Sequence, residues 1–297
     1  MMRAILFRLE AALVWAGLTG LRALGPVAAS NVAGALARAV GPLLAVSRVA
    51  EVNLRLAMPE LDPAARRRVV RGVWETLGRT IGELSNLDRL HRSAAGPGWE
   101  IEGEAHVQAI LAAGGPAIMV SGHLGNWELL TPVGAACGLR VGGFYRAAAN
   151  PHVDRLIGTF RGRAMPGVPL FAKGAAGGRA AFAHLRAGGV LGILADQKLN
   201  DGIAATLFGH RAMTAQAAAS FALHLRCPLL PLHVVRLGPA RLRVVVEPPL
   251  PLPDSGERDA DILALTEAIN RRLEAWVRER PESWLWLHRR WPKEFYA

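Results

Sequence analysis

The sequence predicts an α/β sandwich with a mostly parallel central sheet, preceded by an apolar helical region that anchors it to a membrane. Three observations lead to this. Short apolar runs alternate with helical segments, as in sheets covered by helices. Residues 1–49 are rich in Ala, Leu and Val. The mean hydropathy of +0.21 is high for a soluble enzyme but well below that of a protein with several membrane spans.

The predicted anchor occupies residues 1–49. Glu10 and Arg22 bracket an apolar run of only eleven residues, shorter than a confident membrane span. Val27–Ser30 has the small residues of a signal-peptidase site. Because another Ala/Leu/Val-rich helical stretch continues to Val49, we favour a retained helix that lies on or weakly spans the membrane over a cleaved signal.

The α/β domain follows as residues 50–297. Asp62 and Pro63 supply the cap and first-turn proline of a helix. Its apolar residues recur at helical spacing: Val70, Val73, Trp74, Leu77, Ile81 and Leu84. Five apolar runs are predicted as strands: Ala117–Ser121, Arg140–Tyr145, Val190–Ala195, Leu229–Val235 and Leu242–Val246. Helices are predicted at 104–113, 126–137, 151–163, 177–187, 214–225 and, after a Pro-rich connector, 259–280. Sites in such sheets gather at the carboxyl ends of the strands.

Charge and cysteine content restrict the partners. The net charge of +11 suits an anionic membrane surface, phosphorylated substrates or acidic carrier proteins. The charges are scattered, without a basic tail or a stripe of stacking aromatics, so we expect no nucleic-acid partner. Cys137 and Cys227 are the only cysteines and neither is spaced with a His as in metal sites, so we expect no disulfide framework, no metal and no other cofactor.

The sharpest candidate site is the stretch Ser121-Gly122-His123-Leu124-Gly125-Asn126-Trp127-Glu128, where a strand runs into a glycine-containing turn. Inside one helix, His123 and Glu128 would lie about 140° apart and would not meet. With the turn first and Asn126 as a helix cap, the imidazole can fold back onto the Glu128 carboxylate.

Such a pair has a chemical use. The Glu128 carboxylate would fix the tautomer of His123 and raise its basicity, so that the second ring nitrogen takes a proton from a hydroxyl, which then attacks a thioester. Loop amides and the helix N-terminus would stabilise the oxyanion. The structural alternative is that Glu128 complements the helix dipole and His123 is a buried or loop histidine. The position at a strand end between glycines favours catalysis.

Other function classes fit less well. No G-x-S-x-G elbow accompanies Ser121, which disfavours a serine hydrolase. No H-E-x-x-H is present, which disfavours a metallohydrolase. A non-catalytic membrane lipid-binding protein is the alternative from another class, against which the His123 and Glu128 pair argues.

Further short motifs extend over nearly the whole chain: Glu51-Val52-Asn53-Leu54-Arg55, Met58-Pro59-Glu60, Gly82-Glu83, Tyr145-Arg146, Asn150-Pro151, Ala195-Asp196-Gln197, Phe208-Gly209 and Pro281–Trp291. With the His123–Glu128 block they make the chain resemble the lipid A biosynthesis lauroyl/myristoyl (late) acyltransferases, within the H-x4-D/E lysophospholipid acyltransferase superfamily. Lys198-Leu199-Asn200 departs from that family's usual pattern, which concerns the acceptor more than the reaction.

The resemblance implies an O-acyltransferase whose catalytic domain is residues 50–297. It implies transfer of a fatty acyl chain from an acyl carrier protein thioester to a hydroxyl of a phosphorylated glycolipid, a lipid A precursor, at the cytoplasmic face of the inner membrane. His123 would be the general base and Glu128 its orienting partner. Coenzyme A as the donor and another lysophospholipid or glycolipid as the acceptor stay open.

Six residues are predicted to bind substrate: Gly122, Asn126, Arg146, Arg179, Asp196 and Gln197. Arg146 follows a strand end and Arg179 opens a helix, and a guanidinium fork suits the phosphates of an acceptor. Asp196 and Gln197 end an apolar strand, where polar groups often face a site.

The C-terminal stretch carries Trp284, Leu287, His288 and Trp291 at helical spacing beside two arginines. An interfacial helix with its rings at headgroup level is one interpretation. A helix that closes the core is the other, and we favour it. Neither makes these residues catalytic.

Overall fold

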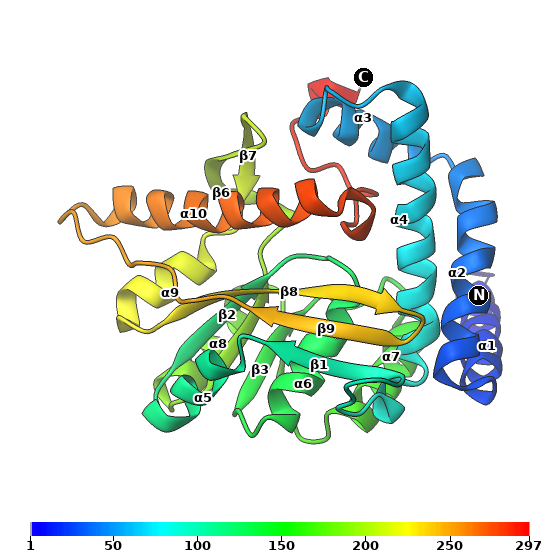
Figure 1. Ribbon diagram of the computed structural model, residues 1–297, viewed down its shortest axis with the longest axis horizontal. Coiled ribbons are helices and arrows are strands. Elements are labelled where there is room, and N and C mark those ends of the chain that lie inside the picture. The colour runs from blue at the N-terminus through cyan, green and yellow to red at the C-terminus, as the bar shows by residue number, and fades with distance from the viewer. Residues whose placement is uncertain (1, 297) are drawn as a thin grey trace.

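A seven-stranded sheet forms the centre of the computed structural model, which describes residues 2–296 (Figure 1). The strand order is β1-β9-β8-β2-β5-β3-β4. The strands are β1 Gly98–Glu102, β2 Ala117–Ser121, β3 Val141–Tyr145, β4 Leu170–Ala172, β5 Val190–Leu194, β8 Leu229–Gly238 and β9 Arg241–Val246. Neighbours pair in parallel except β8 and β9. The predicted α/β fold with a mostly parallel sheet is confirmed.

Helices cover both faces of this sheet. One face packs against α5 (Glu104–Ala113) and α6 (Leu130–Ala136). The other packs against α8 (Ala175–Arg186), α9 (Ala217–Leu225) and α10 (Arg258–Glu279). Side chains of a strand alternate between the two faces, so in β2 Met119 joins the first cluster while its neighbours Ile118 and Val120 join the second.

The predicted elements match the observed ones closely where apolar periodicity is strong. The helix that Asp62 caps is α4 (Pro63–Leu84), and the Asp62 carboxylate accepts the Ala65 N–H at 2.7 Å. The segment predicted as one helix over 126–137 is a 3₁₀ turn, η3 (Trp127–Leu129), followed by α6. α7 is Pro151–Ala164, near the predicted 151–163.

A hairpin of β6 (Lys198–Leu207) and β7 (His210–Thr214) was not predicted. It takes up Thr214, so that α9 begins at Ala217 and not at Thr214 as predicted. β1 and β4 were also missed. β1 has two glutamates among its five residues and so shows no apolar run, and β4, with three residues, is too short to show a pattern.

The C-terminal stretch is not the predicted helix. After η4 (Pro281–Ser283) the backbone is extended at Trp284, and the last regular element is η5 (Lys293–Tyr296). Trp284, Trp286 and Trp291 are fully buried beside α3 (Ser47–Ala57), α4 and the end of α10. The prediction of an interfacial helix is therefore wrong. The prediction that this segment closes the core is confirmed, although its backbone is irregular and not helical.

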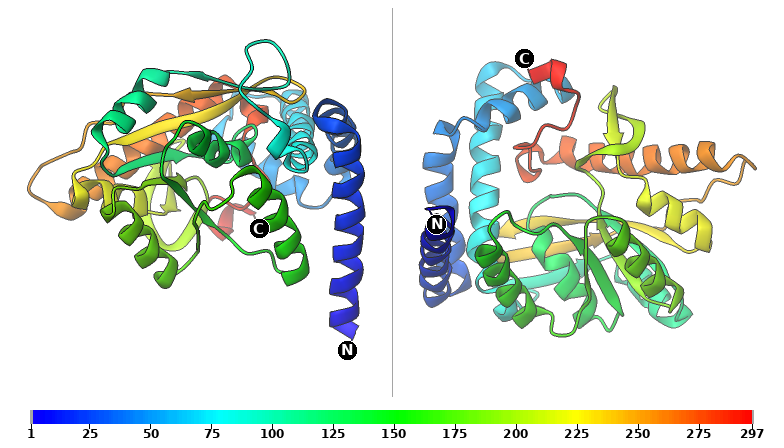
Figure 2. Two further views of the ribbon diagram at one scale, coloured as in Figure 1. Left: turned by 90° about the horizontal axis from the view of Figure 1, so that it is seen from below. Right: turned by 180° about the vertical axis from the view of Figure 1, so that it is seen from behind.

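The N-terminal region consists of α1 (Met2–Ala23), α2 (Gly25–Val40) and a bend with η1 (Gly41–Leu43) before α3. Arg3–Ala23 is long and apolar enough to cross a membrane, a test that a signal sequence also passes. The predicted eleven-residue run, residues 11–21, is the C-terminal half of this longer helix. Figure 2 shows α1 along the outside of the molecule, its N-terminal end reaching past the rest of the chain.

α2 packs closely against α4. A Cβ at Gly78 or Gly82 of α4 would lie 2.3 or 2.4 Å from the carbonyl oxygen of Ala33 or Ala29. Glycine at these positions lets the two helix backbones approach. The division into residues 1–49 and 50–297 stays a prediction. Both helices of the first region contact the second: α2 packs on α4, and in α1 Arg22 pairs with Asp88 and Glu10 accepts from Asn150.

Candidate active site

A sharp turn follows β2 and presents the histidine of the predicted motif. Gly125 has φ +57°, and a Cβ there would lie 2.5 Å from the carbonyl oxygen of Val234. Glycine is therefore required in this conformation. The Gly125 N–H donates to the Ser283 carbonyl at 3.0 Å, and its carbonyl accepts the Thr80 hydroxyl at 2.9 Å. The turn is thus held by distant parts of the chain.

The C-terminal segment pairs with the same turn. Leu124 forms an antiparallel bridge with Trp284, and the Leu285 N–H donates to the His123 carbonyl at 3.0 Å. The backbone on each side of the histidine is therefore fixed by residues about 160 positions later in the chain.

Asp196 holds the imidazole of His123. Its Oδ1 lies 2.7 Å from Nδ1 of His123, and its Oδ2 accepts the His123 backbone N–H at 2.8 Å. Oδ2 also accepts the indole N–H of Trp284 at 2.7 Å. Asp196 follows β5, which pairs in parallel with β2, so their carboxyl ends bring the two residues together. Since a carboxylate only accepts, Nδ1 carries the proton and Nε2 is left as the basic nitrogen.

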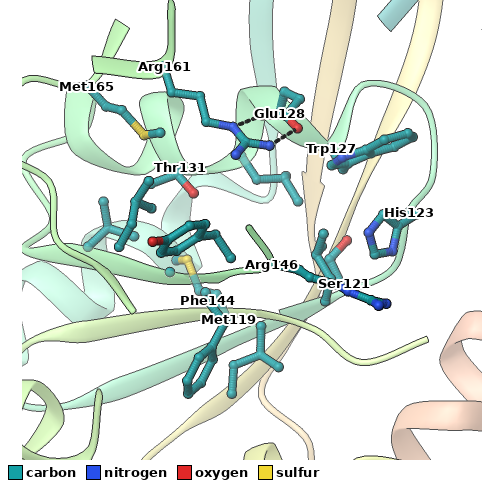
Figure 3. A pocket seen from close by; sticks show the side chains of 18 of the residues that line it. Met119, Ser121, His123, Trp127, Glu128, Thr131, Phe144, Arg146, Arg161 and Met165 are labelled. Atoms are coloured by element: carbon teal, nitrogen blue, oxygen red, sulfur yellow. Dashed lines mark hydrogen bonds and ion pairs between the residues drawn. The ribbon is translucent and has the colours of Figure 1, made fainter. Parts of the chain in front are cut away.

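Glu128 does not bond to His123, which corrects the predicted contact. Its two oxygens accept Nε and Nη2 of Arg161 on α7 at 2.7 and 2.6 Å, in a bidentate ion pair (Figure 3). The short turn η3 aims Glu128 at α7 and away from the imidazole. The Glu128 carboxylate thus holds Arg161 in place. Asp196, not Glu128, is the hydrogen-bond partner of the His123 imidazole.

A cavity of about 300 Å³ opens beside the His123 ring. Its polar lining includes His123, Glu128, Arg161, Arg146 and Gln197. Most of its remaining walls are apolar: Met119, Leu130, Val141, Phe144, Met165, Leu170, Ile193, Leu194 and Leu232 (Figure 3). The cavity therefore combines charged side chains with apolar walls suited to a hydrocarbon chain.

The ionisation of His123 follows from its neighbours. Burial opposes protonation, but the charge and hydrogen bond of Asp196 and the charge of Glu128 together raise its pKa above the ordinary 6.5. Burial acts to raise the pKa of Asp196, and the contacts with His123 outweigh it, holding the pKa well below the usual range. For Arg161, the Glu128 ion pair outweighs burial and raises the pKa.

The sequence model of one protein family, the bacterial lipid A biosynthesis acyltransferases, matches residues 4–293 of the chain. The chain belongs to this family. No individual curated protein matches it. Membership makes the protein an enzyme that transfers acyl groups, with an acyl donor and a lipid acceptor as its substrates.

Within this acyltransferase, the predicted substrate-binding residues have different surroundings. Arg146 and Gln197 line the cavity, and the Gln197 amide lies 3.3 Å from Nε2 of His123. Arg179 is exposed on α8 and is not part of the cavity lining. A Cβ at Gly122 would lie 3.2 Å from Cγ of Asp196, so glycine there leaves space for that carboxylate.

Asp196 and Asn126 are predicted substrate ligands whose side chains are turned away from the cavity. Asp196 is fully buried and its two oxygens are occupied by His123 and Trp284. Asn126 is also fully buried, makes no capping bond, and donates to Oε2 of Glu83 at 2.8 Å. Asp196 accepts the backbone N–H of His123, and Asn126 ties the end of the turn that carries His123 to Glu83.

Glu83 forms a buried ion pair with Arg236 of β8 that supports the turn. One oxygen also accepts the Ser30 hydroxyl of α2 at 2.7 Å and the Ala240 N–H at 3.1 Å. Through Ser30, Asn126, Arg236 and Ala240, the Glu83 carboxylate links α2, α4, the turn that carries His123 and the β8–β9 connection. A buried carboxylate needs such a set of donors to offset its desolvation.

Sequence reasoning missed Arg161 and Trp284. Arg161 is one of many arginines in the chain, and no local pattern marks it. Trp284 was predicted only as part of the Pro281–Trp291 motif and of a C-terminal helix, with no role at the site. No group of three or more His, Cys, Asp and Glu side chains within residues 2–296 is arranged to hold a metal ion.

Proposed function

We propose that this acyltransferase moves a fatty acyl chain from an acyl carrier protein thioester to a hydroxyl of a phosphorylated glycolipid, a lipid A precursor. The observation that carries the proposal is the His123 imidazole, whose Nδ1 is bonded to Asp196 while its ring lines a cavity with apolar walls. Family membership supports the acyl chemistry and the lipid acceptor.

In this mechanism His123 is the general base. Its Nε2 removes the proton of the acceptor hydroxyl as the oxygen attacks the thioester carbonyl, so a C–O bond forms and the carbonyl becomes a tetrahedral oxyanion. The C–S bond then breaks, and the leaving thiolate takes the proton back from the imidazolium. Asp196 orients the imidazole and stabilises its charged form, the role that the sequence assigned to Glu128.

Glu128 acts through Arg161 in this proposal. Arg161 uses Nε and Nη2 for the carboxylate, which leaves Nη1 for the substrate. The turn amides of His123, Leu124 and Gly125 donate elsewhere and do not form the predicted oxyanion site. Arg161 is a donor at the cavity that can take this role, and Glu128 keeps it in place.

The lining of the cavity indicates which kinds of substrate group it can hold. Its apolar walls take the acyl chain, and Arg146 in its lining is placed for a phosphate of the acceptor or of the donor's prosthetic group. The proposal places α1 in the inner membrane with the cavity on the cytoplasmic side. Exposed Ile5, Leu6, Leu9 and Leu13 support membrane contact, as does the absence of Asp and Glu from residues 11–50.

The test compares variants with unchanged thermal unfolding in acyl transfer from acyl carrier protein. We expect His123→Ala and Asp196→Asn to lose about a hundredfold to ten-thousandfold in turnover. Glu128→Gln should lose more than Glu128→Asp, which can still pair with Arg161. Replacement of the exposed His224 on α9 by Ala is the matched control and should leave turnover unchanged.

Near-normal turnover of His123→Ala would falsify the mechanism, and no transfer by the wild type would point to the non-catalytic alternative. Offering acyl carrier protein and coenzyme A thioesters as donors identifies the donor. Offering a phosphorylated glycolipid and a lysophospholipid as acceptors, with mass spectrometry of the products, separates the two acceptor classes.

A further inference from the structure

Asp196 is held on both sides, and the second side belongs to the C-terminal segment. Its Oδ1 faces Nδ1 of His123, and its Oδ2 accepts the Trp284 indole N–H at 2.7 Å. Trp284 is 1% exposed and Asp196 is completely buried, so the indole replaces the water that would otherwise solvate this oxygen. A buried carboxylate without that donor would lack a charge-assisted hydrogen bond.

The position of the indole is fixed by the backbone as well as by packing. Trp284 is paired with Leu124 in the catalytic turn, so its Cα moves with the turn. The ring packs against Trp286, with centroids 4.5 Å apart, and against Phe208, with centroids 6.3 Å apart, and these two rings also contact each other. The donor is therefore preorganised, because neither backbone nor side chain must rearrange to reach Asp196.

We propose that Trp284 is a positioning residue of the acyl-transfer reaction, whose indole N–H holds the Asp196 carboxylate in the place and orientation from which it orients His123. The inference rests on the proposed function of His123 as the base and assigns a role in it to the C-terminal segment. Trp284 does not line the cavity, so its effect on the reaction passes through Asp196.

The role has a consequence for proton transfer. The indole draws negative charge from the carboxylate that also stabilises the His123 imidazolium. Without the N–H, that carboxylate binds the Nδ1 proton more strongly, and neutral imidazole forms only at higher pH. Glu128, His288 and Arg290 also face the His123 and Asp196 pair. Glu128 and Arg290 keep their charges in a Trp284 variant, whereas burial lowers the pKa of His288, whose ring contacts Trp284.

The experiment removes the N–H and keeps the apolar bulk. Trp284→Phe and Trp284→Met both lack the donor, and the flexible Met side chain fills irregular space. The matched control is Trp286→Phe, because Trp286 is equally buried and its indole donates at 2.7 Å to the Pro281 carbonyl, outside the site. We expect both Trp284 variants to lose about tenfold to hundredfold in kcat, the range for a hydrogen bond to a charged group.

Three further readouts separate positioning from a structural role. KM should stay within about twofold of wild type, since ground-state binding is unchanged. The acid limb of the kcat/KM profile, and the His123 pKa measured by NMR, should move to higher pH only in the Trp284 variants. In an Asp196→Asn background, Trp284→Phe should have no additional effect on kcat beyond that of Trp286→Phe.

A Trp284→Phe profile identical to that of Trp286→Phe would overturn the inference, as would failure of both Trp284 variants to fold. If His123→Ala is inactive and Trp284→Phe is normal, the proposed function stands and this inference fails. If the wild type transfers no acyl group, the proposed function fails, while the NMR pKa still decides whether the indole acts on His123.

Discussion

The two ends of the chain both contain tryptophan and leucine, but tryptophan is exposed at the N-terminal end and buried at the C-terminal end. Each contains tryptophan, leucine and arginine, and each has the composition of a membrane-contacting segment. In the structure, α1 turns Leu13 and Trp15 outward, 75% and 55% exposed, while Trp284, Trp286 and Trp291 are buried. Apolar residues of similar kind are thus exposed at one end of the chain and buried in the core at the other.

The difference has a local cause. Residues 2–23 form a helix with apolar residues over most of its circumference, so it buries only part of them against the domain. The C-terminal stretch between Pro281 and Pro292 consists of a 3₁₀ turn, one bridge residue and irregular turns, and its side chains enter the space between α3, α4 and α10. Replacements at the two ends should therefore have opposite consequences.

Trp291→Ala and Trp15→Ala give the largest expected contrast. Truncation of fully buried Trp291 should lower the free energy of unfolding by about 3–5 kcal/mol through lost burial and a cavity. Trp15→Ala should change it by less than about 0.5 kcal/mol, as for exposed positions generally. Chemical denaturation in one mild detergent measures both, and equal losses would contradict the assignment of the two ends.

Membrane contact should respond in the reverse sense. Leu9→Asp and Leu13→Asp should each weaken binding to anionic vesicles about tenfold or more, since burial of a leucine contributes about 1.5–3 kcal/mol. Leu263→Asp on α10 is the control and should bind normally. These changes are sharper than deletion of residues 1–22, which also removes the bidentate pair of Arg22 with Asp88. Unchanged vesicle flotation of both leucine variants would contradict a lipid-facing α1.

The smallest expected effect is on the pH dependence of activity. It should distinguish a change at the site from a change in α1. The Asp196 carboxylate raises the His123 pKa, so Asp196→Asn should lower it and move the acid limb of the residual activity to lower pH. Leu13→Asp should not move it.

The stability of the pair should follow the same ionisations. Its contribution is lost as pH rises through the raised folded pKa of His123 and as pH falls through the lowered folded pKa of Asp196. In the unfolded chain, Asp and His have pKa values of about 4 and 6.5. Asp196→Asn should therefore lower the free energy of unfolding most between these two pH values, and less at higher pH. A difference that grows above pH 6.5 would contradict the ion pair.

Much of the fold was predictable because it is written in local patterns. The runs that form β2, β5 and β8 are continuous and apolar, and the Asp62-Pro63 start of α4 is a local capping signal. The place of His123 after β2 followed from the strand end and the glycines. The proposed membrane contact and the domain division were also predicted, and they stay predictions.

The partner of His123 was not predictable in this way. Glu128 is five residues away and looked like the natural acceptor, whereas Asp196 is 73 residues away. Only the neighbouring position of β2 and β5 in the sheet decides between the two carboxylates. The helical spacing from Trp284 to Trp291 misled for a related reason, since pairing with the catalytic turn outweighs local helix preference.

The pairing of Leu124 with Trp284 also sets an order in time. During synthesis the turn that carries His123 leaves the ribosome about 160 residues before its backbone partner Trp284. Until Trp284 has been added, the turn lacks this partner and Asp196 lacks its indole N–H donor. The surroundings of His123 are therefore complete only when the C-terminal segment has been made and has folded back onto the turn.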